Sequence, residues 1–315
     1  MISKDLNKTT KNICFINNFN NEKFIESCLK SVFNQTIPFD EVILVDDGSS
    51  DRSLEVVSIF LKDHINLKII KKENEGQLST FNAALGYIPD EAQIFLLDGD
   101  DIYPQDYLEA TLNSIGRSRW DFAFCERQGF VDQVDAPKSA IFNTLPCYYF
   151  ASTSALVRSR RCWIGNVTSC ISISSELYKK IFPYPYTPKT FWVDDLLNYS
   201  SSILGAKKIH IPSIRIGWRD HLANNSKKQY SEADIRRRNV AISQTFDWYC
   251  DQHFVNRYPR VVEFFEEYKL LDRNWKNQLD LPNKYRMINR LIRDLVKQYC
   301  KNQLDAVRKV FFKGS

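Results

Sequence analysis

One stretch, residues 94–101, constrains the fold of this chain most strongly. Four apolar residues, Ile-Phe-Leu-Leu, run directly into Asp-Gly-Asp-Asp. A short apolar run that ends in this way is typical of a buried strand in a parallel sheet. Ligands of open α/β sheets bind just beyond the carboxyl ends of such strands, so three carboxylates are predicted to lie at a ligand site.

The three acids, Asp98, Asp100 and Asp101, would repel one another strongly without a cation. Hard divalent ions such as Mg²⁺ or Mn²⁺ take oxygen ligands and share them with phosphates. The hypothesis that follows is a metal–diphosphate site at this turn. The alternative is a solvated acidic turn after a strand.

Short apolar runs alternate with amphipathic segments through the first 125 residues. This alternation predicts a doubly wound α/β half with strands at 12–16, 42–45, 67–70, 94–97 and 122–125. A second acidic pair, Asp46 and Asp47, follows the strand at 42–45, so both groups of acids can converge on one crevice. The sequence contains neither G-x-G-x-x-G nor G-x-x-x-x-G-K-[ST], which argues against a dinucleotide-type loop and a P-loop enzyme.

Farther along the chain, the pattern predicts strands at 170–173, 208–211 and 215–219. It also predicts a helix at 175–182 and a second helix that begins at 191. Asp194 and Asp195 fall in the first turn of that second helix, where acids also suit the helix dipole, so a purely structural role stays open. The aromatic residues 148–150 and Trp163 are interpreted as core or as the wall of an acceptor cleft.

Charge is unevenly spread along the chain. Residues 1–226 carry 24 Lys/Arg against 27 Asp/Glu, whereas residues 227–315 carry 19 against 11. The last predicted helix bears a basic stripe formed by Arg286, Arg290, Arg293, Lys297 and Lys301. Such a helix can lie on an anionic bilayer surface or meet a lipid-linked phosphate; the alternative is a solvated basic face of a helix packed on its own domain.

The chain has no run of 18 apolar residues and no charged-then-apolar leader, so neither a spanning helix nor a signal peptide is expected. Its eight cysteines are scattered without a C-x-x-C pair, which favours reduced thiols over a disulfide or zinc framework. We therefore expect a cytoplasmic protein whose basic tail contacts the inner face of the membrane.

Six motifs follow one another in order along the chain: NNFNNE at 17–22, VDDGSSD at 45–51, NEGQ at 74–77 followed by Asn82 and Leu85, LDGDD at 97–101, the acid pair 194–195, and His221 shortly before 224–226. This order resembles that of the family 2 glycosyltransferases of the GT-A fold over residues 12–226. The resemblance implies a Rossmann-like α/β fold with a mixed, mainly parallel sheet flanked by helices. We expect a catalytic domain over residues 1–226 and a basic helical region over 227–315.

The resemblance also implies how a nucleotide sugar is bound. Phe19 would stack on the base, Asp47 would bond it with Asp46 alongside, and Asp98 would bind the ribose. The remaining candidates for this site are Asn17, Gly76, Gln77 and Gly99.

A metal and a base complete the implied site. Asp100 would hold Mn²⁺ or Mg²⁺ with His221, and Asp98 is a further candidate ligand. In the family the second acid of a Glu-Asp pair deprotonates the acceptor hydroxyl, which points to Asp195; here the pair is Asp194-Asp195, so which acid is the base stays open. A positioned carboxylate is needed because a sugar hydroxyl is a poor nucleophile at neutral pH, and a divalent ion neutralises the leaving diphosphate.

Together these features predict a metal-dependent inverting transferase that moves a sugar from a nucleotide-diphosphate sugar, most commonly a uridine diphosphate sugar in this family, to a hydroxyl of a glycan or lipid-linked acceptor. One alternative is a haloacid-dehalogenase-like phosphatase, although that family places its D-x-D turn on the first strand. Another is an inactive GT-A scaffold or glycan-binding subunit. A homodimer is compatible with the sequence, and nucleic acid is not an expected partner.

Overall fold

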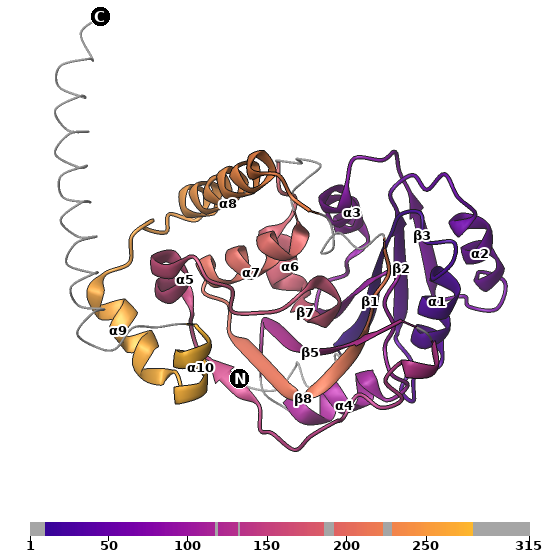
Figure 1. The fold of residues 1–315 in the computed structure, drawn as a ribbon, viewed down its shortest axis with the longest axis horizontal. Coiled ribbons are helices and arrows are strands. Elements are labelled where there is room, and N and C mark those ends of the chain that lie inside the picture. Colours follow the sequence, from indigo (N-terminus) through magenta and orange to yellow (C-terminus); the bar gives the residue numbers. More distant parts are fainter. Residues whose placement is uncertain (1–9, 117–118, 132, 186–191, 223–228, 280–315) are drawn as a thin grey trace, which may run out of the picture. The chain divides into compact units, whose positions relative to one another are not determined.

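The computed structural model describes residues 10–116, 119–131, 133–185, 192–222 and 229–279. Its strands are β1 (Lys11–Asn18), β2 (Glu41–Asp46), β3 (Leu67–Lys71), β4 (Ala92–Asp98), β5 (Phe122–Phe130), β6 (Tyr148–Phe150), β7 (Ile171–Ser174) and β8 (Lys208–Arg219). These described strands form one sheet in the order β3-β2-β1-β4-β7-β5-β8-β6 (Figure 1). The chain divides into two compact units, Met1–Tyr258 and Pro259–Ser315, and the sheet belongs to the first.

The first unit also contains the helices α1 (Ile25–Phe33), α2 (Ser53–Phe60), α3 (Gln77–Ala84), α4 (Tyr107–Ile115), α5 (Ser154–Arg160), α6 (Ser175–Ile181), α7 (Val193–Ile203) and α8 (Glu232–Gln252). Side chains alternate between the two faces of each strand, so each face has its own cover. Cys14 and Ile16 of β1 share a buried cluster with apolar residues of α1, α2 and α4. The opposite face carries Phe15, whose ring lies 4.7 Å from Phe81 of α3.

The parallel strands β3, β2, β1 and β4 form one half of the sheet, as the alternation predicted. The other half is mixed, because β7 runs antiparallel between β4 and β5 and β6 runs antiparallel at the edge. The strand at 122–125 is therefore separated from the strand at 94–97 by a segment that comes later in the chain. The mixed, mainly parallel sheet flanked by helices confirms the predicted fold class.

The prediction of two strands at 208–211 and 215–219 was wrong, because both belong to the single strand β8. Its register against β5 shifts between Cys125 and Glu126, where Ile211 and Arg215 are the successive partners. Pro212 lies in the skipped part of β8. Proline has no N–H for a sheet ladder, so a local bulge lets the strand continue past it.

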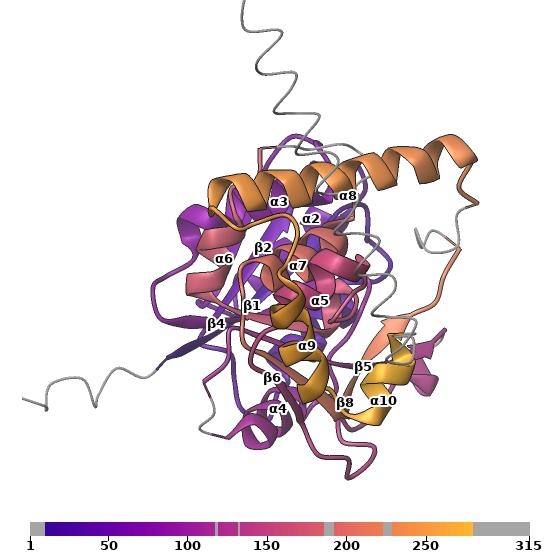
Figure 2. The same ribbon diagram turned by 90° about the vertical axis from the view of Figure 1, so that its left-hand side faces the viewer.

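The long helix α8 belongs to the first unit, so the compact units divide later in the chain than the boundary expected at 226/227. The reason is packing against α7, beside which α8 runs in Figures 1 and 2. Phe246 of α8 has its ring 5.1 Å from that of Tyr199, and the hydroxyl of Tyr249 donates to the carbonyl of Ile181. α8 thereby becomes part of the unit that carries the motifs.

The second unit contains α9 (Val261–Leu270) and α10 (Arg273–Gln278) within the described residues, with Phe264 and Trp275 buried. The predicted basic stripe at 286–301 lies outside the described residues.

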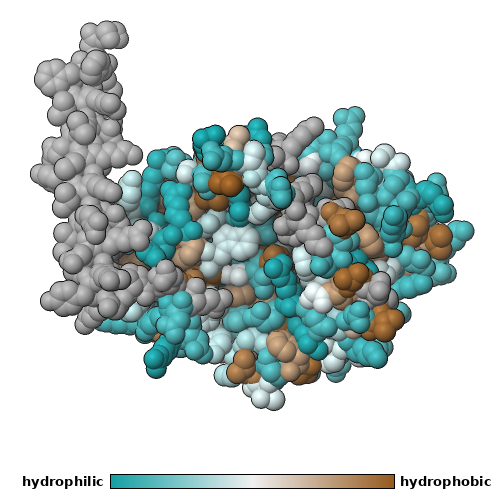
Figure 3. All heavy atoms as spheres, in the orientation of Figure 1, coloured by the Kyte–Doolittle hydropathy of each residue, from teal (hydrophilic) through white to brown (hydrophobic). Residues whose placement is uncertain are grey.

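On the face shown in Figure 3, hydrophobic side chains form small separate groups among hydrophilic ones. In the part of the chain that the structure describes, no helix combines the length and apolar character that crossing a membrane requires. The seven described cysteines are free thiols.

Candidate functional site

The parallel strands β1, β2 and β4 place the predicted motifs side by side. Asn17 near the end of β1 pairs in register with Val45 of β2 and Asp98 of β4. Each of these strands is followed by a polar turn, so three turns meet at the carboxyl edge of the sheet, as expected for an α/β ligand site.

Gly99 allows the acidic turn after β4 to lie against the turn after β1. Its N–H donates to the carbonyl of Asn17 at 2.9 Å. A Cβ atom at this position would lie 2.7 Å from Oδ1 of Asn18 and 2.9 Å from Nδ2 of Asn21. Cβ atoms essentially never approach other atoms this closely, so any side chain here would force Asn18 and Asn21 to shift.

Asp98 at the end of β4 is held by two side-chain amides, one from the end of β1 and one from the start of α3. Its Oδ1 accepts hydrogen bonds from Nδ2 of Asn17 at 3.1 Å and from Nε2 of Gln77 at 3.0 Å. Burial, followed by the charge of Asp100, raises the pKa of Asp98 to about 7, although the two amides act in the opposite direction. The structure therefore brings together Asn17, Gln77 and Asp98, three of the residues predicted for the nucleotide-sugar site.

Asp101 points into the protein. It accepts from the hydroxyl of Ser169 at 2.5 Å and from the backbone N–H of Arg219 at 2.8 Å, and it is 2% exposed. Burial and the charges of Asp100 and Asp98 raise the pKa of Asp101 well above its ordinary value. Arg219 also donates from Nε to the carbonyl of Asp100, so it ties the acidic turn to the end of β8.

Asp100 and His221 form a pair at the partly exposed side of the same turn. Nε2 of His221 lies 2.9 Å from Oδ2 of Asp100, and the imidazole centroid lies 4.6 Å from that of the Phe24 ring, with the two planes tilted by 35°. Among the described residues, no three His, Cys, Asp or Glu side chains are grouped to hold a metal. A carboxylate and an imidazole still fit an ion that shares its coordination shell with substrate phosphates and water, which is how Mg²⁺ is commonly bound.

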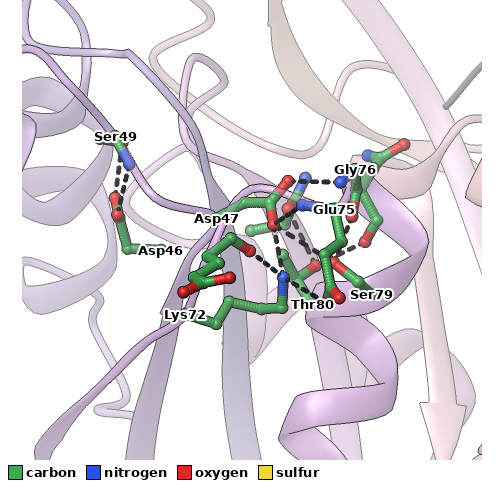
Figure 4. Close-up of polar contacts among 11 residues, drawn as sticks. Asp46, Asp47, Ser49, Lys72, Glu75, Gly76, Ser79 and Thr80 are labelled. Carbon is green, nitrogen blue, oxygen red and sulfur yellow. Dashed lines mark hydrogen bonds and ion pairs between the residues drawn. The ribbon is translucent and has the colours of Figure 1, made fainter.

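The two acids at the end of β2, Asp46 and Asp47, are both buried. Figure 4 shows that they make contacts with different turns. Asp46 accepts from the N–H and hydroxyl of Ser49 and from Nδ2 of Asn18, so it shapes the turns after β2 and β1. Asp47 reaches across to the loop before α3, where it accepts from the backbone N–H of Gly76 at 2.8 Å and from Nζ of Lys72 at 2.8 Å.

Gly76, with φ of 94°, is in a conformation that favours glycine, and this turns its N–H toward Asp47. Phe19, in the turn after β1, has a side chain that is 43% exposed. An exposed aromatic ring offers a face on which a base can stack.

The acid pair at the start of α7 has two different environments. Asp195 is fully buried, and its carboxylate accepts from Nε and Nη2 of Arg238 at 2.7 and 2.9 Å and from the indole N–H of Trp163 at 3.1 Å. Asp194 is partly exposed, and its Oδ1 accepts from the backbone N–H of Asp195. Burial, then the charges of Asp195 and Asp98, raise the pKa of Asp194 to about 7.

Sequence reasoning missed the cations that hold these acids. Lys72 pairs with Asp47, Arg219 supports the turn at 98–101, and Arg238 clamps Asp195. Two of them, Lys72 and Arg238, stand in short basic runs, Lys71-Lys72 and 236–238, which are typical of solvated surfaces. Which member of each run pairs with a buried acid is decided only by the tertiary structure.

The model of the family described as Glycosyl transferase family 2 matches residues 13–182, which covers β1 to α6. An uncharacterized glycosyltransferase of Nostoc sp., alr2836, is 26% identical over 211 residues, a match that covers 67% of this chain and 65% of that protein. The putative glycosyltransferase EpsH of Bacillus subtilis is 34% identical over 107 residues, covering 34% of this chain and 30% of that protein. These matches therefore span less than two thirds of the relatives' own length.

A crystal structure of residues 1–349 of TarS from S. aureus, in complex with UDP-GlcNAc, has a similar fold. Its TM-score is 0.59 at 20% sequence identity, over 89% of this chain and 79% of that one. This similarity confirms the GT-A architecture. Since the family model covers more than half of the chain, this protein belongs to glycosyl transferase family 2.

Proposed function

We propose that this glycosyltransferase moves a sugar from a nucleotide-diphosphate sugar to a hydroxyl group of a glycan or lipid-linked acceptor, with the aid of a divalent metal and with inversion at the anomeric carbon. The observation that carries the proposal is the convergence of Asp47, Asp98, Asp100 and Asp194 around the ends of β2 and β4 and the start of α7. Four carboxylates in one partly buried site repel one another, so such a site favours a cation that also binds a diphosphate.

The nucleotide would bind over the turns after β1 and β2. Exposed Phe19 offers a face for the base, and the chain of hydrogen bonds from Asn17 and Gln77 to Asp98 orients that carboxylate for the ribose. TarS, which shares the fold, has been solved with UDP-GlcNAc and with UDP, and this supports a uridine nucleotide here.

Asp100 and His221 would hold the metal, which when bound neutralises charge on the diphosphate. Another solved structure of similar fold, the mannosyltransferase PcManGT with GDP-Man and Mn²⁺, supports a divalent ion, with a TM-score of 0.50. Asp98, whose Oδ1 already accepts two amide hydrogen bonds, is assigned to the nucleotide rather than to the metal.

Asp194 is the acid that we assign as the base. Asp195 is fully buried and its carboxylate accepts three hydrogen bonds from Arg238 and Trp163, so it is poorly placed to take a proton from an acceptor. Asp194 is partly exposed, and burial and the charges of Asp195 and Asp98 bring its pKa to about 7, which suits a base working near neutral pH.

The reaction then needs no covalent intermediate with the enzyme. The acceptor oxygen forms a bond to the anomeric carbon while the bond from that carbon to the phosphate oxygen breaks. Asp194 takes the hydroxyl proton, and the nucleoside diphosphate leaves with the bonding electron pair. Attack from the side opposite the leaving group inverts the configuration.

Polymer-forming relatives favour a glycan acceptor. Similarity over about a third of the chain extends to the minor teichoic acid biosynthesis protein GgaA of Bacillus subtilis and to the chondroitin synthase of Pasteurella multocida. The phosphatase alternative does not fit, since the D-x-D turn follows the fourth strand of a family 2 glycosyltransferase domain.

The test is a calorimetric titration of UDP-, GDP- and dTDP-sugars, each with Mn²⁺ or with a chelator, followed by an assay of released nucleoside diphosphate. Metal-dependent binding of one class, with turnover that Asp194→Asn abolishes, is expected. Binding without turnover on any acceptor would favour the inactive scaffold. Failure of every nucleotide sugar to bind would refute the proposal.

A further inference from the structure

Arg238 on α8 contacts the acid pair of α7, and both lie beyond the segment that the family model matches. Its guanidinium donates from Nε to Oδ2 of Asp195 at 2.7 Å and from Nη2 to Oδ1 at 2.9 Å. Two parallel hydrogen bonds to a fully buried carboxylate fix both its position and its rotation. The Arg238 side chain is 34% exposed, so the pair lies at the boundary of the core.

Aromatic side chains hold this ion pair from two sides. The guanidinium of Arg238 lies 4.0 Å from the ring of Trp192, the residue that precedes α7. The ring of Trp192 in turn contacts that of Tyr230 edge-on, with centroids 5.4 Å apart. Trp163 donates to Asp195 from a separate loop. Three segments distant in sequence therefore meet at one carboxylate.

The clamp reaches Asp194 through the backbone. The N–H of Asp195 donates to Oδ1 of Asp194 at 3.0 Å, and Nδ2 of Asn198 donates to the carbonyl of Asp194 at 2.7 Å. The first turn of α7 thus places the Asp194 carboxylate relative to Asp195. A displacement of the Asp195 backbone, which the clamp on its side chain opposes, would move the N–H that orients Asp194.

We infer that Arg238 is a positioning residue for sugar transfer, which holds Asp195 by a two-pronged ion pair and thereby fixes Asp194. This inference rests on the proposed function, in which Asp194 is the base. It makes α8 a working part of the catalytic unit, although the family model ends before it.

The charges around Asp194 determine in which direction its pKa should change when Arg238 is replaced. Asp195 and Asp98 raise its pKa, whereas Arg238 lowers it. The other titratable or charged groups that face this cluster include Tyr199 on α7 and Tyr230 before α8. Arg161 and Cys162 after α5 act on Tyr199, and Asp234 on α8 acts on Tyr230. Removing Arg238 alone leaves the charge of Asp195 uncompensated, so the pKa of Asp194 should rise. Removing Asp195 and Arg238 together should lower it, because the effect of Asp195 is the larger.

The experiment compares the full-length protein with Arg238→Gln, Arg238→Lys and the double variant Asp195→Asn/Arg238→Gln. The probe is the nucleotide sugar that the unaltered protein turns over with Mn²⁺. Arg238→Gln should reduce kcat about 100-fold, the order of loss for a catalytic group displaced by about 1 Å, and leave the donor Kd unchanged. Arg236→Gln is the matched control, since this neighbour on α8 is 74% exposed and should keep full activity.

The rate–pH profile separates positioning from simple support of the fold. The acidic limb of this profile, where the rate rises with pH, should move to higher pH in Arg238→Gln. In the double variant it should move to lower pH. Arg238→Lys keeps the charge but loses the planar guanidinium. The acidic limb should therefore lie at the same pH as in the unaltered protein, while kcat stays reduced. A lower melting temperature with an unmoved limb and an unchanged kcat would overturn the inference.

A direct titration keeps this test independent of turnover. With ¹³C-labelled aspartate carboxyl groups, NMR reports the pKa of Asp194 without any substrate. If the unaltered protein turns over no nucleotide sugar, the proposed function fails, and a rise in this pKa in Arg238→Gln still supports the electrostatic link. An unchanged pKa in both Arg238→Gln and the double variant would refute the link.

Discussion

Replacing Asp194 by Asn should stabilise the protein at alkaline pH while it abolishes transfer. Burial and two neighbouring carboxylates raise the pKa of Asp194 from 3.8 to about 7. One pKa unit corresponds to about 1.4 kcal/mol, so keeping this group ionised in the folded state costs as much as about 4 kcal/mol. Asparagine is neutral at every pH and retains an oxygen that can accept the N–H of Asp195.

The sign follows from proton binding in the two states. Between pH 3.8 and about 7 the folded state keeps the proton of Asp194 and the unfolded state has lost it, so stability falls as pH rises through this window. Above about pH 7 the whole cost is present, and below the unfolded-state pKa it vanishes. The gain from Asp194→Asn should therefore be largest near pH 8 and should shrink steadily toward pH 5.

Calorimetric melting of the full-length protein in a chelating buffer measures this gain, and Asp195→Asn is the matched control. That neighbouring change removes one end of the ion pair with Arg238, so it should lower stability by roughly 2 kcal/mol. Opposite effects of the same chemical change at adjacent positions are the expected result. A loss of stability in Asp194→Asn near pH 8, or a gain that does not depend on pH, would refute the reasoning.

Three further predictions concern the strand ends. Gly99→Ala should lower stability by about 1–3 kcal/mol and weaken nucleotide binding, since its Cβ would lie 2.7 Å from Asn18; urea unfolding and titration with UDP check this. His221→Gln should remove the Mn²⁺ dependence of UDP binding, and calorimetry that finds the dependence intact would exclude this residue as a ligand. Lys72→Met leaves Asp47 buried beside three uncharged donors, and should lower the melting temperature and weaken UDP binding together.

The half of the fold that precedes residue 100 was predictable because its signals are local. Strands buried on both faces appear as continuous apolar runs, and each ends where the sequence turns polar. In the structure β1 pairs with β2 and β4 along these apolar runs. The position of β7 was not predictable, because its insertion between β4 and β5 depends on pairing between segments about 50 residues apart or more.

The candidate site was predictable as a set of acids but not as a set of contacts. Spacing along the chain shows that Asp98 and Asp100 follow a strand, and it also shows where Asp194 opens a helix. It cannot show that Arg238 crosses from α8, since that contact spans 43 residues. The same limit applies to Arg219, which joins the end of β8 to a turn more than 100 residues earlier.

Tandem acids explain why this site combines rigidity with reactivity. At 100–101 and at 194–195, one acid is buried and saturated with hydrogen bonds, and its neighbour is partly exposed. Successive side chains at a strand end or in the first turn of a helix leave the backbone in different directions. One carboxylate of each pair can therefore be anchored in the protein interior while its neighbour is presented to the site. At 194–195 the charge of the anchored Asp195 also repels that of Asp194 and raises the pKa of Asp194. A substitution of either acid should therefore alter both stability and chemistry, and the sign of the stability change distinguishes the anchor from the presented acid.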